Sequence, residues 1–168
     1  MGIIVVHGSP GNGKTTISKK LHEMLEAPWF EFGWIPEFAK LNPHNKILPK
    51  EEEQLAFENL VLVSKNYIKH GFENVILSDL NDARMLDIPM QFGEVHYIII
   101  TLFSERDDVI TDRILTRDNG NDYKNFEESI ATNKKIIGRA LLPNEYRIRS
   151  DNQTVEAITA QIIISIPN

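Results

Sequence analysis

Short apolar runs alternate with longer amphipathic stretches along the chain. The runs are rich in β-branched residues, which is typical of strands buried on both faces of a parallel sheet. In most of the stretches between them, apolar residues recur every three or four positions, as they do on one face of a helix. The pattern predicts strands at about residues 3–6, 29–32, 75–77, 95–102 and 146–149.

The amphipathic stretches also carry local helix signals. In the stretch 51–70, residues such as Ala56 and Leu60 share one face, and Gly71 follows at a position where helices often end. The side chain of Ser104 can cap another helix at its amino terminus. The further predicted helices lie at about residues 16–26, 104–116, 126–142 and 155–166, with a loop or a short helix at 80–90.

Strands that alternate with helices predict an α/β fold, in which helices cover both faces of a parallel sheet. With 168 residues, the chain is expected to form one domain, residues 1–168, with a substantial core. Ligands of such sheets bind beyond the carboxyl ends of the strands. Residues that follow the predicted strands are therefore the first candidates for chemistry.

A glycine-rich segment follows the first predicted strand. Residues 8–15 read Gly-Ser-Pro-Gly-Asn-Gly-Lys-Thr, the pattern G-x-x-x-x-G-K-[ST] of a phosphate-binding loop. The alternative is a glycine turn with an incidental Lys-Thr pair, and the strand before and the helix after the segment argue against it. The segment predicts a nucleoside triphosphate and Mg²⁺ as ligands.

Each residue type in this loop suits a triphosphate. The glycines allow positive φ angles and keep side chains away from the backbone N–H groups. A helix that begins near Gly13 points its positive end at the β-phosphate. Lys14 is placed to bridge the β- and γ-phosphates, while Thr15 offers a hydroxyl to Mg²⁺ and Thr16 one to the α-phosphate. The predicted nucleotide-binding residues are Gly8, Ser9, Pro10, Gly11, Asn12, Gly13, Lys14, Thr15 and Thr16.

An acidic residue follows the strand predicted at 75–77. Asp79 stands where a carboxylate can hold the water shell of a magnesium ion beside Thr15. The alternative is an aspartate that caps the loop, which is common at strand ends. Asp82 is the substitute if the loop brings it closer to the metal.

Two arginines lie four positions apart at the end of the helix predicted at 104–116. Arg113 and Arg117 therefore share one helix face, from which their guanidinium groups can reach the γ-phosphate and offset charge on the transferred group. The alternative is a solvated face that pairs with nearby acids. The spacing alone does not decide between the two.

Residues 29–38 are unusually aromatic and include two glutamates. If the second strand ends here, the segment faces the γ-phosphate and forms a pocket for an acceptor, with Trp34 and Phe38 in its wall. Glu31 or Glu37 is then placed to act as the general base on an acceptor hydroxyl. The alternative is that the aromatic residues belong to the core and the glutamates to the surface.

The composition excludes several classes of protein. The formal net charge of −6 and the lack of a Lys/Arg stripe count against an extended nucleic acid as a partner. The chain has no cysteine, hence no disulfide and no thiolate zinc site. The apolar run 97–103 is too short to cross a bilayer, and Met1 leads directly into the first strand without room for a signal peptide. We expect a cytoplasmic monomer or homodimer that binds no membrane.

Two segments resemble known kinases. The glycine-rich loop, the helix 16–26 and the segment Ala27-Pro28-Trp29-Phe30-Glu31-Phe32-Gly33 resemble the amino-terminal part of chloramphenicol phosphotransferase, a small P-loop kinase related to adenylate and shikimate kinases. Asp112-Arg113-Ile114-Leu115-Thr116-Arg117 resembles the start of the mobile lid of adenylate kinase, where two arginines four apart contact the phosphates. This resemblance favours the phosphate role for the two arginines.

The resemblance implies a three-layer P-loop fold: a five-stranded parallel sheet in the order 2-3-1-4-5, with helices on both faces and a short lid at about residues 113–133. It implies that ATP with Mg²⁺ is the phosphoryl donor and that a small molecule bound at about residues 29–70 is the acceptor. In relatives, backbone near the fifth strand holds the adenine, which corresponds here to residues 150–153.

The chain departs from the phosphotransferase at the acceptor site. The family has a catalytic aspartate two residues after the glycine that matches Gly33, and this chain has Ile35 there. The base must therefore come from elsewhere, such as Glu31 or Glu37, or be absent. Chloramphenicol itself is not implied as the acceptor.

Taken together, these residues predict an ATP-dependent kinase that moves the γ-phosphate to a small molecule, at a hydroxyl group. Residues 27–70 contain no arginine, which disfavours a nucleoside monophosphate as acceptor, and Arg84 is left to orient an anionic or polar acceptor. One alternative is an NTPase or nucleotide-dependent switch that acts through a protein partner. Another is a polynucleotide-end kinase, against which the acidic charge counts.

Overall fold

The computed structural model describes residues 2–35, 44, 46–117 and 122–166. Five parallel strands form one sheet in the order β2-β3-β1-β4-β5, which confirms the predicted fold class and strand order. Strand β1 lies at the centre; its carboxyl end is close to level with that of β3, while β4 extends two residues further. The strands are β1 (Gly2–His7), β2 (Trp29–Glu31), β3 (Asn74–Ser78), β4 (Tyr97–Phe103) and β5 (Glu145–Arg149).

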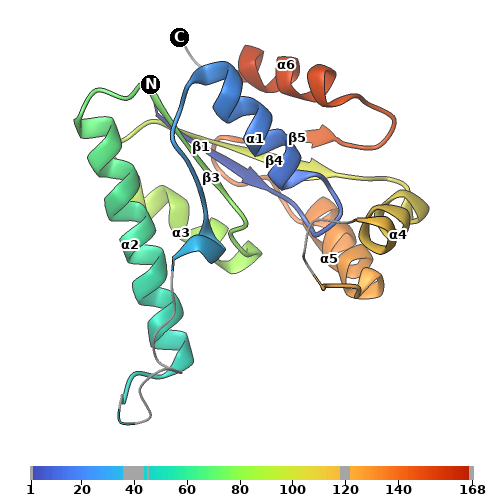
Figure 1. Cartoon of the computed structure of the whole chain (residues 1–168), viewed down its shortest axis with the longest axis horizontal. Coiled ribbons are helices and arrows are strands. Elements are labelled where there is room, and N and C mark those ends of the chain that lie inside the picture. Colours follow the sequence, from blue (N-terminus) through green and yellow to red (C-terminus); the bar gives the residue numbers. More distant parts are fainter. Residues whose placement is uncertain (1, 36–43, 45, 118–121, 167–168) are drawn as a thin grey trace.

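Helices cover both faces of the sheet. Figure 1 shows α1 and α6 on one face and α2, α3 and α5 on the other, while α4 packs beside α5. A single 3₁₀ turn, η1, follows β2. The helical elements are α1 (Lys14–Leu25), η1 (Phe32–Trp34), α2 (Pro49–Lys69), α3 (Asp82–Gln91), α4 (Asp107–Thr116), α5 (Phe126–Gly138) and α6 (Val155–Ser165).

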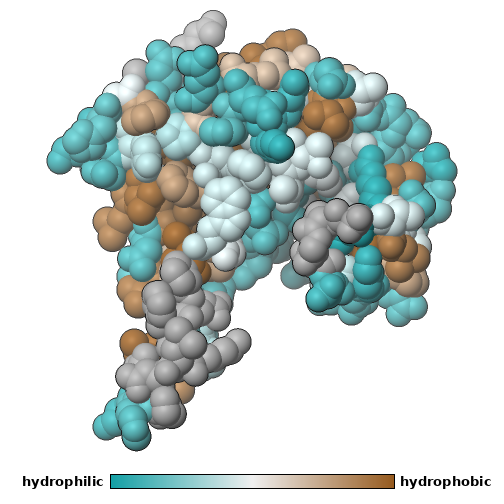
Figure 2. All heavy atoms as spheres, in the orientation of Figure 1, coloured by the Kyte–Doolittle hydropathy of each residue, from teal (hydrophilic) through white to brown (hydrophobic). Residues whose placement is uncertain are grey.

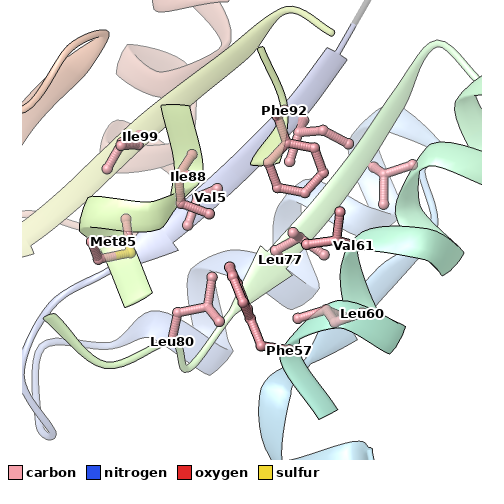
Figure 3. Packing of buried hydrophobic residues seen from close by; sticks show 12 residues of the cluster. Val5, Phe57, Leu60, Val61, Leu77, Leu80, Met85, Ile88, Phe92 and Ile99 are labelled. Carbon is pink, nitrogen blue, oxygen red and sulfur yellow. The ribbon is translucent and has the colours of Figure 1, made fainter. Parts of the chain in front are cut away.

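Each face of the sheet buries its own apolar core. Alternate residues of a strand point to opposite faces, so Ile3 and Val5 belong to one core and Ile4 and Val6 to the other. Figure 3 shows how α2 and α3 fill the first core against β1, β3 and β4, with Phe57 from α2 and Met85 from α3 among the fully buried side chains. In the described part of the chain, no helix is long and apolar enough to span a bilayer.

The segment predicted as a loop or a short helix at 80–90 is the helix α3. The side chain of Asn81 caps it by accepting a hydrogen bond from the N–H of Arg84, at 2.9 Å. Helix α2 begins two residues earlier than predicted, at Pro49, because proline suits the first position of a helix, where no N–H donor is needed.

Two other boundaries also differ from the prediction. Ser104 does not cap α4: its hydroxyl lies 3.0 Å from both the N–H and the carbonyl oxygen of Arg106, and the helix begins only after this turn. Helix α5 was expected to reach residue 142, but it ends at Gly138, since Arg139 is already extended. The low helix propensity of glycine accounts for this early end.

Candidate nucleotide-binding site

A cleft of about 920 Å³ opens at the carboxyl ends of the strands. Its floor is the loop between β1 and α1, and its walls come from the ends of β2, β3, α4 and β5. In Figure 2 the surface is hollowed between α2 and the pair formed by α4 and α5. The residues around the cleft are Pro10, Gly11, Asn12, Gly13, Lys14, Thr15, Thr16, Ile17, Glu31, Asp79, Arg113, Thr116, Arg117, Tyr123, Ser150, Gln153, Val155 and Ile158.

The loop has the backbone conformation that its glycines predict. Gly8, Gly11 and Gly13 have φ angles of 140°, 85° and 86°. At Gly8, a Cβ atom would lie 2.4 Å from the carbonyl oxygen of Leu102 on β4, so no larger residue fits without movement of the backbone. The space saved there lets the loop turn sharply away from the end of β1.

Helix α1 begins directly beneath the cleft. Its N-cap is Gly13, which provides no side chain to cap the first N–H groups of the helix. Those N–H groups, together with the positive end of the helix dipole, form a site suited to an anion. The arrangement is the one expected for a phosphate-binding loop.

Lys14 and Asp79 meet in the cleft. The ammonium of Lys14 lies 3.6 Å from the Asp79 carboxylate, and its side chain is only 11% exposed. Burial lowers the pKa of Lys14, while the negative charges of Asp79 and Glu31 act in the opposite direction. Asp79 directly follows β3 and has a φ of 65°, in the left-handed region that aspartate adopts more readily than most residues.

A second carboxylate approaches from the end of β2. The Thr15 hydroxyl donates a hydrogen bond to Glu31 at 2.9 Å. Thr15 and the two carboxylates of Glu31 and Asp79 thus place oxygen atoms around the first turn of α1, and oxygen is the donor that Mg²⁺ prefers. These side chains are therefore chemically suited to a magnesium ion that phosphate oxygens also bind.

The two arginines predicted from their spacing both line the cleft. Arg113 donates hydrogen bonds to the carbonyl oxygens of Gly11, at 3.3 Å, and Ser150, at 2.9 Å. Arg117 donates to the carbonyl oxygen of Tyr123, and its guanidinium carbon lies 5.5 Å from the centre of the Tyr123 ring. Arg113 thus joins the phosphate-binding loop to the segment after β5, while Arg117 holds the segment that leads into α5.

Three other predicted residues, Arg84, Asp82 and Trp34, do not line the cleft. The Arg84 guanidinium is held between α2 and α3, 3.3 Å from Glu53 and 3.2 Å from Asp87. Asp82 pairs with Arg139 at 3.1 Å and not with Lys14. Trp34 is 53% exposed, and Glu37 and Phe38 lie outside the described residues.

The other aromatic residues near β2 belong to the core. Phe30 and Phe32 pack against the core on the α2 side, and Trp29 packs against the core on the α1 side. The Trp29 ring also lies 4.9 Å from that of Trp34, and its N–H donates to Ser78 at 2.9 Å. For these three residues the alternative of core packing is the correct one.

Some residues of the cleft carry no signal in the sequence. Tyr123 stands in a polar loop, and Val155 and Ile158 belong to the apolar pattern of α6, so nothing local marks them as cleft residues. Ser150 and Gln153 line the cleft within the segment expected near the adenine. Contacts between distant segments bring these residues to the cleft, and the pattern of apolar and polar positions does not indicate such contacts.

Comparison with known proteins agrees with this geometry. Residues 1–76 match the family of chloramphenicol phosphotransferase-like proteins. No curated protein sequence gives a significant match.

Several solved structures share the fold. A sugar kinase from Janibacter sp. HTCC2649 has 20% identity and a TM-score of 0.67, with 98% of this chain and 93% of the other covered. The tunicamycin resistance protein of Deinococcus radiodurans has 20% identity and a TM-score of 0.68, with 97% and 94% covered. Shikimate kinase from Bacteroides thetaiotaomicron has 17% identity and a TM-score of 0.62, with 98% and 99% covered. The resemblance seen in the sequence is confirmed: residues 1–76 match the family model of chloramphenicol phosphotransferase-like proteins, and the whole chain shares its fold with the sugar kinase and shikimate kinase structures.

Proposed function

We propose that the protein transfers the γ-phosphoryl group of ATP to a hydroxyl group of a small molecule, with Mg²⁺ bound beside the phosphates. The observation that carries this proposal is the position of Lys14, buried at the floor of the cleft next to the glycine loop and 3.6 Å from Asp79. A buried cation above the amino end of a helix is suited to a polyanion. The kinase fold supports the same reaction.

The residues of the loop would bind and orient the triphosphate. Lys14 would leave Asp79 to contact the β- and γ-phosphates, and the N–H groups at the start of α1 would contact the phosphates from below. Thr15 and Asp79 would hold Mg²⁺, which when bound neutralises charge on the phosphates. Gly8 to Thr16 are proposed as the nucleotide-binding residues for this reason.

The helix α4 and the segment after it would close the cleft. We assign Arg113 and Arg117 to the transferred phosphate and residues 113–133 to a lid. Ser129 and Asn133, near its end, would stay fixed against the phosphate-binding loop, so the part before them would move. Arg113 already lies against Gly11, so a small change of its side chain would bring it to a bound phosphate. Closure would exclude water and suppress hydrolysis of ATP.

The acceptor would bind between the γ-phosphate and the segment 29–70. Its hydroxyl oxygen would form a bond to the γ-phosphorus while the bond from that phosphorus to the β–γ bridging oxygen breaks, leaving ADP. The hydroxyl proton would pass to a carboxylate, for which Glu31 and Glu37 are the candidates. The position of Glu31 supports this role, because its carboxylate accepts a hydrogen bond from the Thr15 hydroxyl at 2.9 Å, beside the proposed phosphate site. Trp34 and Phe38 are proposed as acceptor contacts, and Arg84 as a further contact only if the acceptor displaces Glu53 and Asp87 from its guanidinium.

The proposal is tested by the variant Lys14→Ala. We expect this variant to fold and to lose both ATP binding, measured by calorimetry with Mg²⁺, and phosphoryl transfer, measured as ADP formed in the presence of a panel of hydroxyl compounds. Lys19→Ala, an exposed lysine on the same helix, is the matched control. Transfer at the wild-type rate by Lys14→Ala would contradict the site.

The same assay separates the kinase from the alternative. If no small molecule accelerates ATP turnover and a protein partner does, the chain is an NTPase or switch.

A further inference from the structure

Helix α5 reaches the phosphate-binding loop through two side chains. The Ser129 hydroxyl donates a hydrogen bond to the carbonyl oxygen of Pro10 at 3.0 Å. The Asn133 side-chain oxygen accepts one from the amide of Asn12 at 3.0 Å. Ser129 and Asn133 are four positions apart and therefore lie on one face of the helix. Both are buried, with 0% and 2% of the residue exposed.

The amide of Asn133 has one orientation that satisfies all its neighbours. Its nitrogen donates to the carbonyl oxygen of Ser104 at 2.7 Å, and its oxygen also accepts from the N–H of Ser104 at 3.2 Å. Because Ser104 fixes both ends of the amide, the oxygen must face Asn12. Ser104 follows β4, so Asn133 joins the end of a central strand to the loop.

Asn12 connects Asn133 to another residue of the loop and to the end of β5. Its side-chain nitrogen donates to the Ser9 hydroxyl at 2.8 Å, and its oxygen accepts from the Ser150 hydroxyl at 3.2 Å. The Asn12 residue is only 1% exposed, although it stands in the loop that lines the cleft. Its side chain therefore anchors the loop to the protein beneath it.

We propose that Asn133 is a positioning residue for the nucleotide, which acts through Asn12 to hold the phosphate-binding loop in its anion-binding conformation before the ligand arrives. This inference rests on the proposed function. Without Asn133, the Asn12 amide loses one of its three partners, and the N–H and carbonyl oxygen of Ser104 lose their bonds to the Asn133 amide. The loop then samples conformations in which its N–H groups do not converge. Binding must then order the loop, which weakens affinity.

The test compares Asn133→Ala with Ser64→Ala. Ser64 is a buried residue whose hydroxyl bonds within its own helix, to the carbonyl oxygen of Leu60. Its variant loses one buried hydrogen bond, against three for Asn133→Ala, and touches no part of the loop. We expect Asn133→Ala to raise the dissociation constant for ATP with Mg²⁺ by about tenfold or more, and Ser64→Ala to leave it unchanged. Equal affinities of both variants would overturn the inference.

A double variant distinguishes positioning from a general loss of stability. If Asn133 acts through Asn12, then Asn12→Ala combined with Asn133→Ala binds ATP no more weakly than Asn12→Ala alone. If the double variant loses the product of the two single-variant losses of ATP affinity, Asn133 does not act through Asn12 and the inference is overturned. Where Asn133→Ala fails to fold, Ser129→Ala serves in its place, with an expected two- to fivefold loss of affinity from the milder deletion.

Hydrogen exchange tests, without any nucleotide, whether Asn133 holds the phosphate-binding loop in place. In the free protein, the backbone N–H groups of residues 11–14 are expected to exchange several-fold faster in Asn133→Ala than in the wild type and in Ser64→Ala. If Asn133→Ala exchanges no faster than the wild type, and the wild type binds ATP, the positioning role of Asn133 is overturned while the kinase proposal stands. If Asn133→Ala exchanges faster but the wild type binds no ATP, the role of Asn133 in holding the loop is supported and the kinase proposal is contradicted.

Discussion

Lys14 is the residue at which opposing electrostatic effects meet. Burial disfavours its charge, and the carboxylates of Asp79 and Glu31 favour it. A bound triphosphate would bring more negative charge than these two groups supply. We therefore expect Lys14 to bind phosphate as a full cation, with its pKa raised from that of the free protein.

At the residue scale, Asp79→Asn distinguishes a role of Asp79 in metal binding from its effect on the charge of Lys14. It removes the carboxylate 3.6 Å from Lys14, so the pKa of Lys14 should fall further, and ATP affinity in the presence of Mg²⁺ should drop by about tenfold. Calorimetry with Mg²⁺ and with a chelator measures the difference, and Glu23→Gln, exposed on α1, is the control. An equal loss under both conditions would contradict a metal role for Asp79.

His7, the last residue of β1, links stability to pH. Burial lowers its pKa below the ordinary value of 6.5, even though Asp82 lies 3.4 Å away and favours the charged form. As the pH falls below about 6.5, the unfolded chain takes up a proton that the folded chain does not, so the free energy of unfolding should decrease. Urea titrations at pH 7.5 and 5.0 measure this decrease, which should be smaller in His7→Gln. An equal decrease in the variant would contradict this origin.

The residues of the site were predictable to different degrees. Lys14 and Thr15 belong to a local motif, and Asp79 follows a strand, so the sequence alone indicates their place. The hydrogen bond from Thr15 to Glu31 spans 16 positions and that from Arg113 to Gly11 spans 102. Such contacts depend on the packing of whole elements, which a pattern of nearby residues does not contain.

At the scale of the element, the turn between β1 and α1 determines how close the loop comes to β4. Gly8→Ala would bring a Cβ to 2.4 Å from the Leu102 carbonyl oxygen, and its φ of 140° adds strain. We expect a loss of about 2–4 kcal/mol in the free energy of unfolding. Gly13→Ala, with a positive φ and open space around it, should cost about 1 kcal/mol.

The same series contains its own control. Gly33→Ala meets no atom within 4 Å and should leave the stability nearly unchanged. Urea unfolding of the three variants gives the order directly. If Gly8→Ala were as stable as Gly33→Ala, the close approach of the loop to β4 would not be present in solution.

Elements were predicted more securely than their ends. The apolar periodicity identifies α1, α2 and β4 because long patterns average over many residues. Their ends depend on single side chains, as with Ser104, whose hydroxyl bonds to Arg106 and does not cap α4. Competing local hydrogen bonds of this kind have no counterpart in the hydrophobic pattern.

At the scale of the whole molecule, alternating strands and helices predict a parallel sheet, and the strand order came from the resemblance to kinases. The structure has that order, with the site at the carboxyl ends of the strands. The packing of α4 against α5 was not predictable to the same degree, because it depends on contacts between segments that are separate in the sequence.

A ligand that binds the folded chain stabilises the whole molecule. ATP with Mg²⁺ at about 100 times its dissociation constant should add about 2.7 kcal/mol to the free energy of unfolding. For a chain of this size the melting temperature should rise by about 5–10 °C, measured by scanning fluorimetry. The shift should vanish in Lys14→Ala and persist in Lys19→Ala. A shift of the same size in Lys14→Ala would place the ligand elsewhere.

The pairing of Arg84 with Glu53 and Asp87 has a practical consequence for the choice of compounds in an acceptor screen. A carboxylate or phosphate ester could use this guanidinium only by displacing two acids that already compensate it. Neutral polyols and glycosides would face no such competition. A screen that begins with uncharged alcohols, and turns to acidic metabolites afterwards, follows the charge balance between α2 and α3.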